Sequence, residues 1–322
     1  MRSPLLSICI ATYNRADFIG ETLDSIIPQL TNEVELLVVD GASTDNTEIV
    51  MNNYLKKCER IRYIRLPVKG GVDQDYNKAV ELALGDMCWL FTDDDLMKPG
   101  AISAVIAALK DGHDLIVVNA EVCNRALSAS LQNKRLAIHD NKIYARHEME
   151  NLFIDALDYL TFIGAVVIRR KVWLSRDREL YFGTEFIHVG VIFQKPLTET
   201  ALIIAEPYIT IRFDNAQWES RRFYIWMFKW PKLVWSFKDI SSGVMEKVTL
   251  EEPWRKFRVL IVKRSDGEYN AKVYYQYLSK QRANVFWKIC AFLISILPRE
   301  VFIGMRNLYS FVKRIYLSYS KS

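Results

Sequence analysis

The sequence lacks paired cysteines, a long apolar run and any repeated or low-complexity segment. Its five cysteines are scattered with no CxxC pair, so we expect reduced core residues of a cytosolic protein. No apolar run approaches the ~20 residues that a bilayer-spanning helix needs. Residues 1–12 also lack the pattern of a secretory leader. These absences predict a cytoplasmic protein that meets a membrane only at its surface.

The composition is that of a globular protein with a modest basic excess. Of 322 residues, 50% are hydrophobic and 25% are charged, and the formal net charge is +5. This length allows one large domain or two ordinary ones, with a substantial core. The cations of the last hundred residues lie among Trp and Leu rather than in a polar stripe, which argues against a nucleic-acid partner.

Apolar strand-like runs alternate with segments of helical spacing through the first 212 residues. Strands are predicted at 5–11, 34–39, 61–66, 88–91, 114–120, 163–168, 202–205 and 208–212. Helices are predicted at 17–30 and 46–57, before Ala83, before Lys110 and at 148–160, with a polar excursion or lid at 121–145. This alternation predicts an α/β fold whose mostly parallel sheet is flanked by helices and whose right-handed crossovers bring the strand ends to one edge.

Four polar loops follow the predicted strands and should converge on one crevice. They contain residues 12–15, Asp40, residues 70–75 and residues 93–95. Ligands of open α/β sheets bind at this carboxyl edge. Asp40 is an acceptor-only group suited to a base or ribose, and Gly70 with Gly71 lets backbone approach a ligand closely.

An acidic run, Asp93-Asp94-Asp95, directly follows the apolar residues 88–91. Three adjacent carboxylates repel one another, and a bound Mg²⁺ or Mn²⁺ would relieve that repulsion while sharing oxygen ligands with substrate phosphates. The metal-independent alternative is an acidic turn that caps a helix.

Glu185 and His188 are three residues apart at the start of a segment with helical spacing. Either side chain could act as a general base, and His188 could complete a metal site. The alternative is that Glu185 caps the helix while His188 is a buried imidazole. The residues themselves leave these alternatives open.

Three motifs together resemble the family 2 glycosyltransferases: residues 7–15 (SICIATYNR), 38–45 (VVDGASTD) and 92–95 (TDDD) with Pro99 beyond. The resemblance implies a GT-A fold that binds a nucleotide with a divalent cation, Mg²⁺ or Mn²⁺. Residues 70–76 (GGVDQDY) are most similar to the branch that adds dideoxyhexoses such as abequose to O-antigen intermediates.

The resemblance also implies roles for individual residues. The nucleotide would contact eight of them: Thr12, Tyr13, Arg15, Asp40, Gly71, Asp75, Asp93 and Asp94. Asp94 and Asp95 would face the cation, with His188 as a further candidate ligand. Many members carry a Glu-Asp pair whose Asp is the catalytic base, but here no Asp follows Glu185, so the base is either Glu185 or His188.

After residue 215 aromatic and basic residues intermingle, and residues 286–297 are apolar nearly all round. We therefore predict a catalytic domain at 1–215 and a helical region at 216–322 that contacts the membrane surface or a second copy of the chain.

The predicted activity is transfer of a sugar from a nucleotide diphosphate donor to a hydroxyl of a saccharide acceptor. The basic-aromatic C-terminal region would hold the enzyme at the inner face of the cell membrane, where a polyprenyl-linked acceptor would lie. A nucleotidyltransferase is an alternative, but the loop at 12–15 has no glycine. A non-catalytic sugar-nucleotide-binding scaffold at the membrane is the other.

Overall fold

The computed structural model describes residues 3–215, 217–304 and 306, which fall into two compact units. The first unit contains the chain up to residue 216 together with residues 236–248, and the second contains residues 217–235 and the chain from 249 onward. The first crossing from one unit to the other, after residue 216, lies one residue from the boundary predicted after residue 215. Residues 236–248, which the prediction assigned to the C-terminal region, return to the first unit, where Phe237 packs on Phe153 and Phe193.

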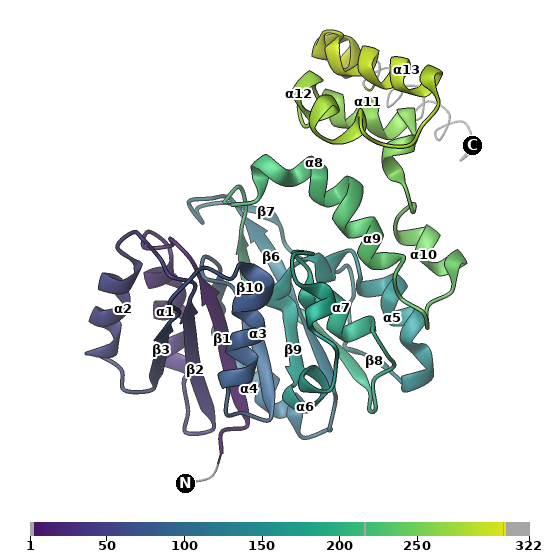
Figure 1. The fold of residues 1–322 in the computed structure, drawn as a ribbon. Helices are drawn as coiled ribbons and strands as arrows, with labels where there is room; N and C mark the ends of the chain where they lie inside the picture. The colour runs from purple at the N-terminus through teal and green to yellow at the C-terminus, as the bar shows by residue number, and fades with distance from the viewer. Residues whose placement is uncertain (1–2, 216, 305, 307–322) are drawn as a thin grey trace, which may run out of the picture. The chain divides into compact units, whose positions relative to one another are not determined.

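The described residues of the first unit form one ten-stranded sheet with helices on both faces (Figure 1). Eight strands follow one path in the order β3-β2-β1-β4-β9-β6-β10-β5. Their bounds are β1 Leu6–Thr12, β2 Val34–Asp40, β3 Ile61–Arg65, β4 Met87–Phe91, β5 Leu96–Met97, β6 Leu115–Cys123, β9 Val166–Arg169 and β10 Ala201–Arg212. The predicted α/β class with a mostly parallel sheet flanked by helices is confirmed.

The first four long strands are parallel, with β1 between β2 and β4. Strand β9 runs antiparallel to both β4 and β6, so it ends at the opposite edge, where Arg169 pairs with Met87 at the start of β4. The expectation that all strands end at one edge therefore does not hold for β9. The runs predicted at 202–205 and 208–212 form a single strand, β10, with an irregularity between Ile204 and Ile209.

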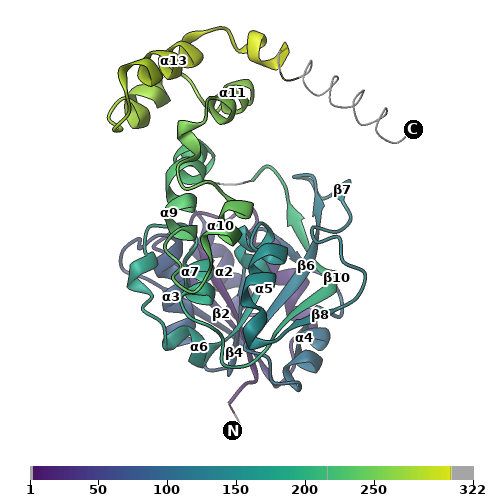
Figure 2. The ribbon, with the colours of Figure 1, turned by 90° about the vertical axis from the view of Figure 1, so that its right-hand side faces the viewer.

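Helices cover both faces of the sheet, which explains why β1 and β2 are almost entirely buried. Figure 2 shows α3 and α4 on opposite sides of the strands. Helix α1 directs Ile19, Leu23 and Ile26 into the interior at helical spacing. The helices of this unit are α1 Ile19–Ile26, α2 Thr47–Leu55, α3 Val72–Leu82, α4 Ala101–Leu109, α5 Met149–Ala156, α6 Arg170–Leu174, α7 Ile187–Phe193 and α10 Ser242–Val248.

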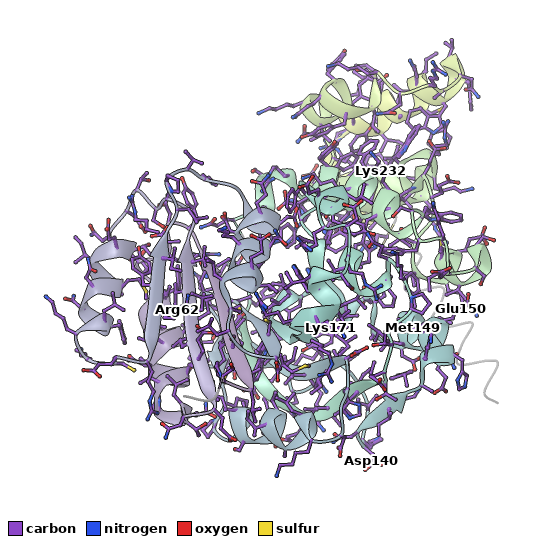
Figure 3. The ribbon with its side chains drawn as sticks, turned by 60° about the horizontal axis from the view of Figure 1, so that its bottom comes forward. Arg62, Asp140, Met149, Glu150, Lys171 and Lys232 are labelled. Carbon is purple, nitrogen blue, oxygen red and sulfur yellow. The ribbon has the colours of Figure 1, made fainter. Side chains whose placement is uncertain are left out.

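An ion pair with a buried carboxylate lies beside this apolar core. Arg62 of β3, labelled in Figure 3, pairs with Glu35 of β2, which also accepts a hydrogen bond from Ser7.

The excursion predicted at 121–145 contributes two short strands that extend the sheet: β7 (Ser130–Gln132) pairs with β6, and β8 (Lys142–Tyr144) pairs with β10.

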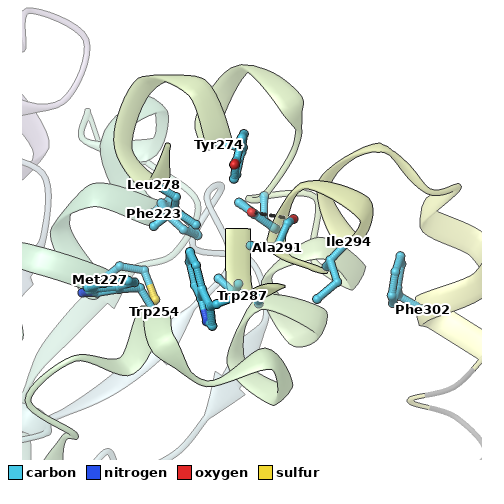
Figure 4. Packing of buried hydrophobic residues seen from close by; sticks show 11 residues of the cluster. Phe223, Met227, Trp254, Tyr274, Leu278, Trp287, Ala291, Ile294 and Phe302 are labelled. Atoms are coloured by element: carbon cyan, nitrogen blue, oxygen red, sulfur yellow. Dashed lines mark hydrogen bonds between the residues drawn. The ribbon is translucent and has the colours of Figure 1, made fainter. Parts of the chain in front are cut away.

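The second unit is helical, as the aromatic-basic composition predicts. Its core is a cluster rich in aromatic side chains, in which Trp254 and Trp287 meet edge to face with ring centroids 5.3 Å apart (Figure 4). Its helices are α8 Arg222–Tyr224, α9 Trp230–Val234, α11 Phe257–Ser265, α12 Ala271–Val273 and α13 Val285–Ile296, with π-helical turns at Ile225–Lys229 and Tyr274–Leu278. Among the described helices, none has both the length and the apolar character needed to cross a bilayer.

Candidate active site

The carboxyl ends of β1 and β2 form one side of the candidate site. Thr12 and Asp40 are register partners at these ends. Asp40 is fully buried, and its two oxygens accept hydrogen bonds from Ser43 N (2.7 Å) and from the Tyr63 hydroxyl (2.6 Å). Burial and the Asp40 carboxylate together raise the pKa of Tyr63, so this phenol stays protonated and keeps donating to Asp40. Asp40 therefore shapes the turn after β2.

Asn14 connects the loops that follow β1 and β2. It has a positive φ of 53°, and its Oδ1 accepts hydrogen bonds from Thr44 N (2.7 Å) and Asp45 N (3.3 Å). Its backbone N–H donates to Ser43 Oγ at 2.9 Å. The sequence prediction gave this residue no role. Its position two residues beyond a strand, and the tolerance of Asn for the left-handed region, were the available signals.

Asp75 lies against the glycines of two loops. It is 3% exposed, and a Cβ added to Gly41 would lie 2.5 Å from its Oδ2, while one added to Gly70 would lie 2.8 Å from its Oδ1. Burial raises the pKa of Asp75 to about 6, and Asp40 adds to the rise, although the backbone N–H groups of Gly70 and Gly71 and the charge of Lys69 oppose it. These glycines are required because the carboxylate takes the space of their missing side chains.

The loops before α3 and after β1 also meet through an aromatic contact. Lys69 Nζ lies 3.5 Å from the centroid of the Tyr13 ring, a cation–π contact. Gly71 has a φ of 93° and caps the N-terminus of α3. The predicted nucleotide-binding residues Tyr13, Gly71 and Asp75 thus lie in the loop after β1, at the N-cap of α3 and in the first turn of α3.

Arg15 reaches from the loop after β1 to the acidic run after β4. Its Nε lies 3.4 Å from Asp93 Oδ1, and its Nη2 lies 3.2 Å from Asp94 Oδ2. Asn215 completes this group, because its Nδ2 donates to Asp94 Oδ2 at 2.9 Å and its carbonyl accepts from Arg15. The structure therefore brings Arg15, Asp93 and Asp94 together, as predicted.

The environment of Asp93 and Asp94 disfavours the ionised form of both carboxylates. Burial, followed by repulsion from Asp94, raises the pKa of Asp93 to about 7, against the opposing effects of Arg15 and the Thr12 hydroxyl. Burial also raises the pKa of Asp94, although Arg15, Asn215 and Arg212 oppose the rise. A pair of carboxylates whose ionised forms are disfavoured in this way fits a site for a further cation.

Asp95 lies in a different environment from its two neighbours. It is 3% exposed, Oδ1 accepts a hydrogen bond from Arg212 N at 2.7 Å, and Oδ2 accepts one from the Thr92 hydroxyl. Burial and the charge of Asp94 raise its pKa well above the usual range. Asp95 thus joins the end of β4 to β10, with both oxygens engaged inside the protein.

His188 occupies a buried position in α7. It is 1% exposed, its Nε2 lies 2.7 Å from the Leu160 carbonyl oxygen, and burial lowers its pKa to about 4. This geometry matches the buried-imidazole alternative. Within the described residues, no three His, Cys, Asp or Glu side chains are grouped to hold a metal ion, so Asp94, Asp95 and His188 are not gathered into one site.

Glu185 lies in the loop before α7, half-buried and with a φ of 73°. The side chain of Asp73, in the first turn of α3, holds this loop: Oδ2 accepts from Glu185 N at 2.9 Å and Oδ1 accepts from Ile187 N at 3.0 Å. The sequence prediction missed Asp73. Asp73 and Glu185 are 112 residues apart in the chain. The only local signal was an acidic residue at the start of a predicted helix.

Comparison with known proteins agrees with this geometry. The model of the family described as "Glycosyl transferase family 2" matches residues 7–174, which is more than half of the chain. The chain belongs to glycosyl transferase family 2. The matched range includes Arg15, Asp40, Asp75 and Asp94. Because the chain belongs to this family, the protein is a glycosyltransferase.

Two relatives of this glycosyltransferase extend the comparison. An abequosyltransferase, RfbV, of Salmonella typhimurium is 28% identical over 275 residues, covering 78% of this chain and 81% of the relative. A GalNAc(5)-diNAcBac-PP-undecaprenol beta-1,3-glucosyltransferase of Campylobacter jejuni is 30% identical over 111 residues, 34% of this chain and 36% of the relative.

Solved structures show the same fold. TarS residues 1–349 of S. aureus, crystallised with UDP-GlcNAc, superposes with a TM-score of 0.59 at 15% identity, covering 94% of this chain and 91% of that one. The predicted GT-A architecture with a C-terminal helical extension is confirmed by this likeness.

Proposed function

We propose that this glycosyltransferase transfers a sugar from a nucleotide diphosphate donor to a hydroxyl of a saccharide acceptor in cell-surface polysaccharide or O-antigen synthesis. The observation that supports it most is the meeting of Arg15 with Asp93 and Asp94, together with the contacts of Tyr13 and Asp75 with the loop between β3 and α3. The names of the relatives, an abequosyltransferase and an undecaprenol-linked glucosyltransferase, agree with this substrate class.

The donor nucleotide would lie over the loops that follow β1, β2 and β4. Thr12, Tyr13, Gly71 and Asp75 border the nucleoside in this proposal. Asp40 is fully buried with both oxygens engaged, so it would shape the turn after β2 rather than contact the nucleoside. Arg15 would turn from the acids toward the diphosphate, since a guanidinium binds phosphate through a planar pair of donors. The UDP-GlcNAc held by TarS is of the same chemical class.

A divalent cation, Mg²⁺ or Mn²⁺, fits Asp94, with Asp93 beside it. Both carboxylates are partly accessible, at 14% and 13% of the side chain, and both have a raised pKa. When bound, the ion offsets negative charge on the leaving diphosphate. Asp95 fits this group less well, because its two oxygens are engaged with Arg212 N and Thr92. His188 also fits less well, because its side chain is 1% exposed and its Nε2 faces the Leu160 carbonyl.

Glu185 is the proposed general base. A carboxylate within reach of the acceptor hydroxyl takes its proton as the new glycosidic bond forms. Glu185 is half-buried on a loop, whereas His188 is enclosed and its Nε2 faces a backbone carbonyl. His188 would have a structural role through its contacts with the Leu160 carbonyl and the Phe186 ring, and its substitution should affect folding more than proton transfer.

Membrane-surface contact through the second unit is part of the proposal. Helix α13 buries Trp287, Ala291 and Ile294, while Phe286 (71%) and Ile289 (53%) are exposed on it. Together with Val285, Leu293, Ile296 and Leu297 they form an apolar face on a helix that also carries Lys288. Apolar side chains flanked by cations suit the headgroup boundary of an anionic bilayer, where a polyprenyl-linked acceptor would lie.

The activity can be tested by measuring nucleoside diphosphate released from UDP-glucose, CDP-glucose, GDP-mannose and dTDP-glucose in the presence of Mn²⁺. We expect at least one donor to be turned over, and we expect Asp94→Asn to abolish turnover while leaving the protein folded. Full activity of Asp94→Asn, or of the wild type in chelator, would contradict the metal role. No turnover of any donor, with no binding of any nucleoside diphosphate, would contradict the transferase.

A further inference from the structure

The N-terminal turn of α3 contacts two loops through two buried acids, Asp73 and Asp75. Asp75 contacts the glycines of the nucleotide side, Gly41 and Gly70. Asp73 instead accepts hydrogen bonds from Glu185 N and Ile187 N of the loop before α7. One helical turn thus connects the proposed donor loops to the loop of the proposed base.

The loop held by Asp73 is one that would not keep its conformation by itself. Glu185 has a φ of 73°, a region that is unfavourable for a non-glycine residue and persists only when the surroundings impose it. Gly183, two residues earlier, also has a positive φ of 80°. Within the loop, Thr184 Oγ donates to the Tyr181 carbonyl at 2.7 Å and accepts from Phe186 N at 3.1 Å. Asp73 contributes the bonds that reach this loop from another helix.

Burial disfavours the ionised form of the Asp73 side chain. It is 4% exposed, and burial raises its pKa to about 6, with the charge of Glu185 adding to the rise and the N–H groups of Glu185, Ile187 and Gly183 opposing it. A buried carboxylate beside the proposed base adds repulsion that a structural contact alone would not need. Its accepting geometry toward two backbone N–H groups is what fixes the Glu185 backbone.

We infer that Asp73 is a positioning residue that holds Glu185 in its left-handed conformation, so that the Glu185 carboxylate faces the acceptor hydroxyl. This inference rests on the proposed role of Glu185 as base. Asn at position 73 is nearly the same size, but its amide nitrogen is a donor and cannot accept the second N–H. A displacement of the base by about 1 Å is enough to reduce the rate by roughly 10²-fold.

The chain offers a matched control in Asp114. This residue is also fully buried and also accepts two backbone N–H groups of a distant loop, from Thr198 (2.9 Å) and Glu199 (2.8 Å). It lies just before β6, at the start of that strand rather than its end. Both N–H groups share Oδ2, so the amide oxygen of Asp114→Asn can keep them, whereas the pairing of Oδ1 with Arg169 Nε (2.8 Å) is lost. The variant therefore perturbs a buried acid that holds a distant loop without touching the loop of Glu185.

The experiment compares Asp73→Asn with Asp114→Asn in two measurements on the full chain. Hydrogen exchange of the amides at 183–187 should accelerate at least tenfold in Asp73→Asn and stay within twofold of wild type in Asp114→Asn. With whichever donor of the four-sugar panel is turned over, kcat should fall by roughly 10²-fold in Asp73→Asn, with the donor KM within twofold. In Asp114→Asn, kcat should stay within twofold of wild type, even if its melting temperature falls further than that of Asp73→Asn.

A double-mutant comparison separates this inference from the proposed function. If Asp73 acts through Glu185, Asp73→Asn should cost no further kcat in the Glu185→Gln background. An inactive Glu185→Gln with a fully active Asp73→Asn would overturn the positioning role alone. A fully active Glu185→Gln would overturn the base itself. Should Asp73→Asn not fold, Asp73→Ser, whose hydroxyl accepts one N–H, replaces it in both measurements with the same criteria.

Discussion

The guanidinium of Arg15 lies 3.2 Å from Asp94 and 3.4 Å from Asp93, so one cation is shared by two neighbouring carboxylates. All three side chains are mostly buried, at 12–14% exposure. In the protein without ligand, this arginine supplies the positive charge that the acids need. In the proposed mechanism Arg15 would turn to the donor diphosphate, and Asp94 would hold a divalent cation that offsets the charge of that diphosphate.

Removal of the Arg15 charge should destabilise the ligand-free protein and make it more sensitive to cations. In Arg15→Gln, two buried carboxylates lose their partner, which we expect to cost about 3–5 kcal/mol of unfolding free energy. Mn²⁺ should then raise the melting temperature more in Arg15→Gln than in the wild type. Arg65→Gln is the control, because the Arg65–Glu48 pair is exposed and should contribute less than about 1 kcal/mol. Equal Mn²⁺ responses in Arg15→Gln and wild type would contradict the shared-charge account.

The raised pKa of Asp93 predicts a stability change with a definite sign. Its pKa is about 7 in the folded protein and 3.8 as a model group, so the folded state holds a proton that the unfolded state releases between these values. The contribution of Asp93 to stability should therefore fall as the pH rises from about 4 to 7. Asp93→Asn removes this penalty and should stabilise the protein at pH 8 by up to about 4 kcal/mol, at 1.36 kcal/mol per pKa unit, with little effect near pH 4.

Asp114→Asn should show the opposite sign when the unfolding free energies of both variants are measured by urea titration at pH 4 and pH 8. Hydrogen bonds from Thr198, Glu199 and Arg169 outweigh burial and lower the pKa of Asp114, so its charge stabilises the fold above the unfolded pKa. Its loss should destabilise the protein at pH 8 and matter less as the pH falls through the lowered pKa. Destabilisation of both variants at pH 8 would contradict the repulsion assigned to Asp93.

Gly41 should be intolerant of a side chain because of Asp75. A Cβ at this position would lie 2.5 Å from Asp75 Oδ2, closer than real Cβ contacts allow, so Asp75 or the loop must shift. We expect Gly41→Ala to weaken nucleoside diphosphate binding by at least about tenfold, as calorimetry would measure. In Gly243→Ala, where nothing lies within 4 Å of the added Cβ, binding should be unchanged. Unaltered binding in both variants would remove the Gly41–Asp75 contact from the proposed site.

The exposed face of α13 can be tested by vesicle sedimentation. A double variant, Phe286→Ser with Ile289→Ser, should reduce cosedimentation with vesicles containing anionic phospholipid, because each side chain loses apolar area that would insert at the headgroup boundary. The matched control replaces Ile49 and Leu180, which are exposed to a similar degree at 61% and 67% but lie in the first unit. If both double variants sediment like the wild type, the face has another role.

Much of the sheet could be predicted because its strands are short apolar runs that end in polar residues. The predicted limits of β1 to β4 differ from those observed by about a residue. The reversed direction of β9 could not be predicted, since it depends on pairing with β4 and β6 rather than on residues 166–169 themselves. The return of residues 236–248 to the first unit is likewise a matter of tertiary packing by Phe237.

The location of the site could be predicted from the sequence, whereas the role of each residue in it could be predicted only in part. Asp93, Asp94 and Asp95 are indistinguishable in the sequence, yet only Asp95 accepts a backbone N–H of β10. The burial of His188 and the reach of Asp73 to Glu185 both arise from contacts between segments far apart in the chain. Local patterns carry no record of such contacts.

The most direct test of the central claim is a thermal-shift titration of UDP, CDP, GDP and dTDP, each with and without Mn²⁺, on the wild type and Asp94→Asn. The account predicts that at least one diphosphate raises the melting temperature of the wild type, that Mn²⁺ increases the shift, and that Asp94→Asn abolishes the Mn²⁺-dependent part. An equal shift with and without Mn²⁺ in both proteins, or no shift with any diphosphate, would contradict it.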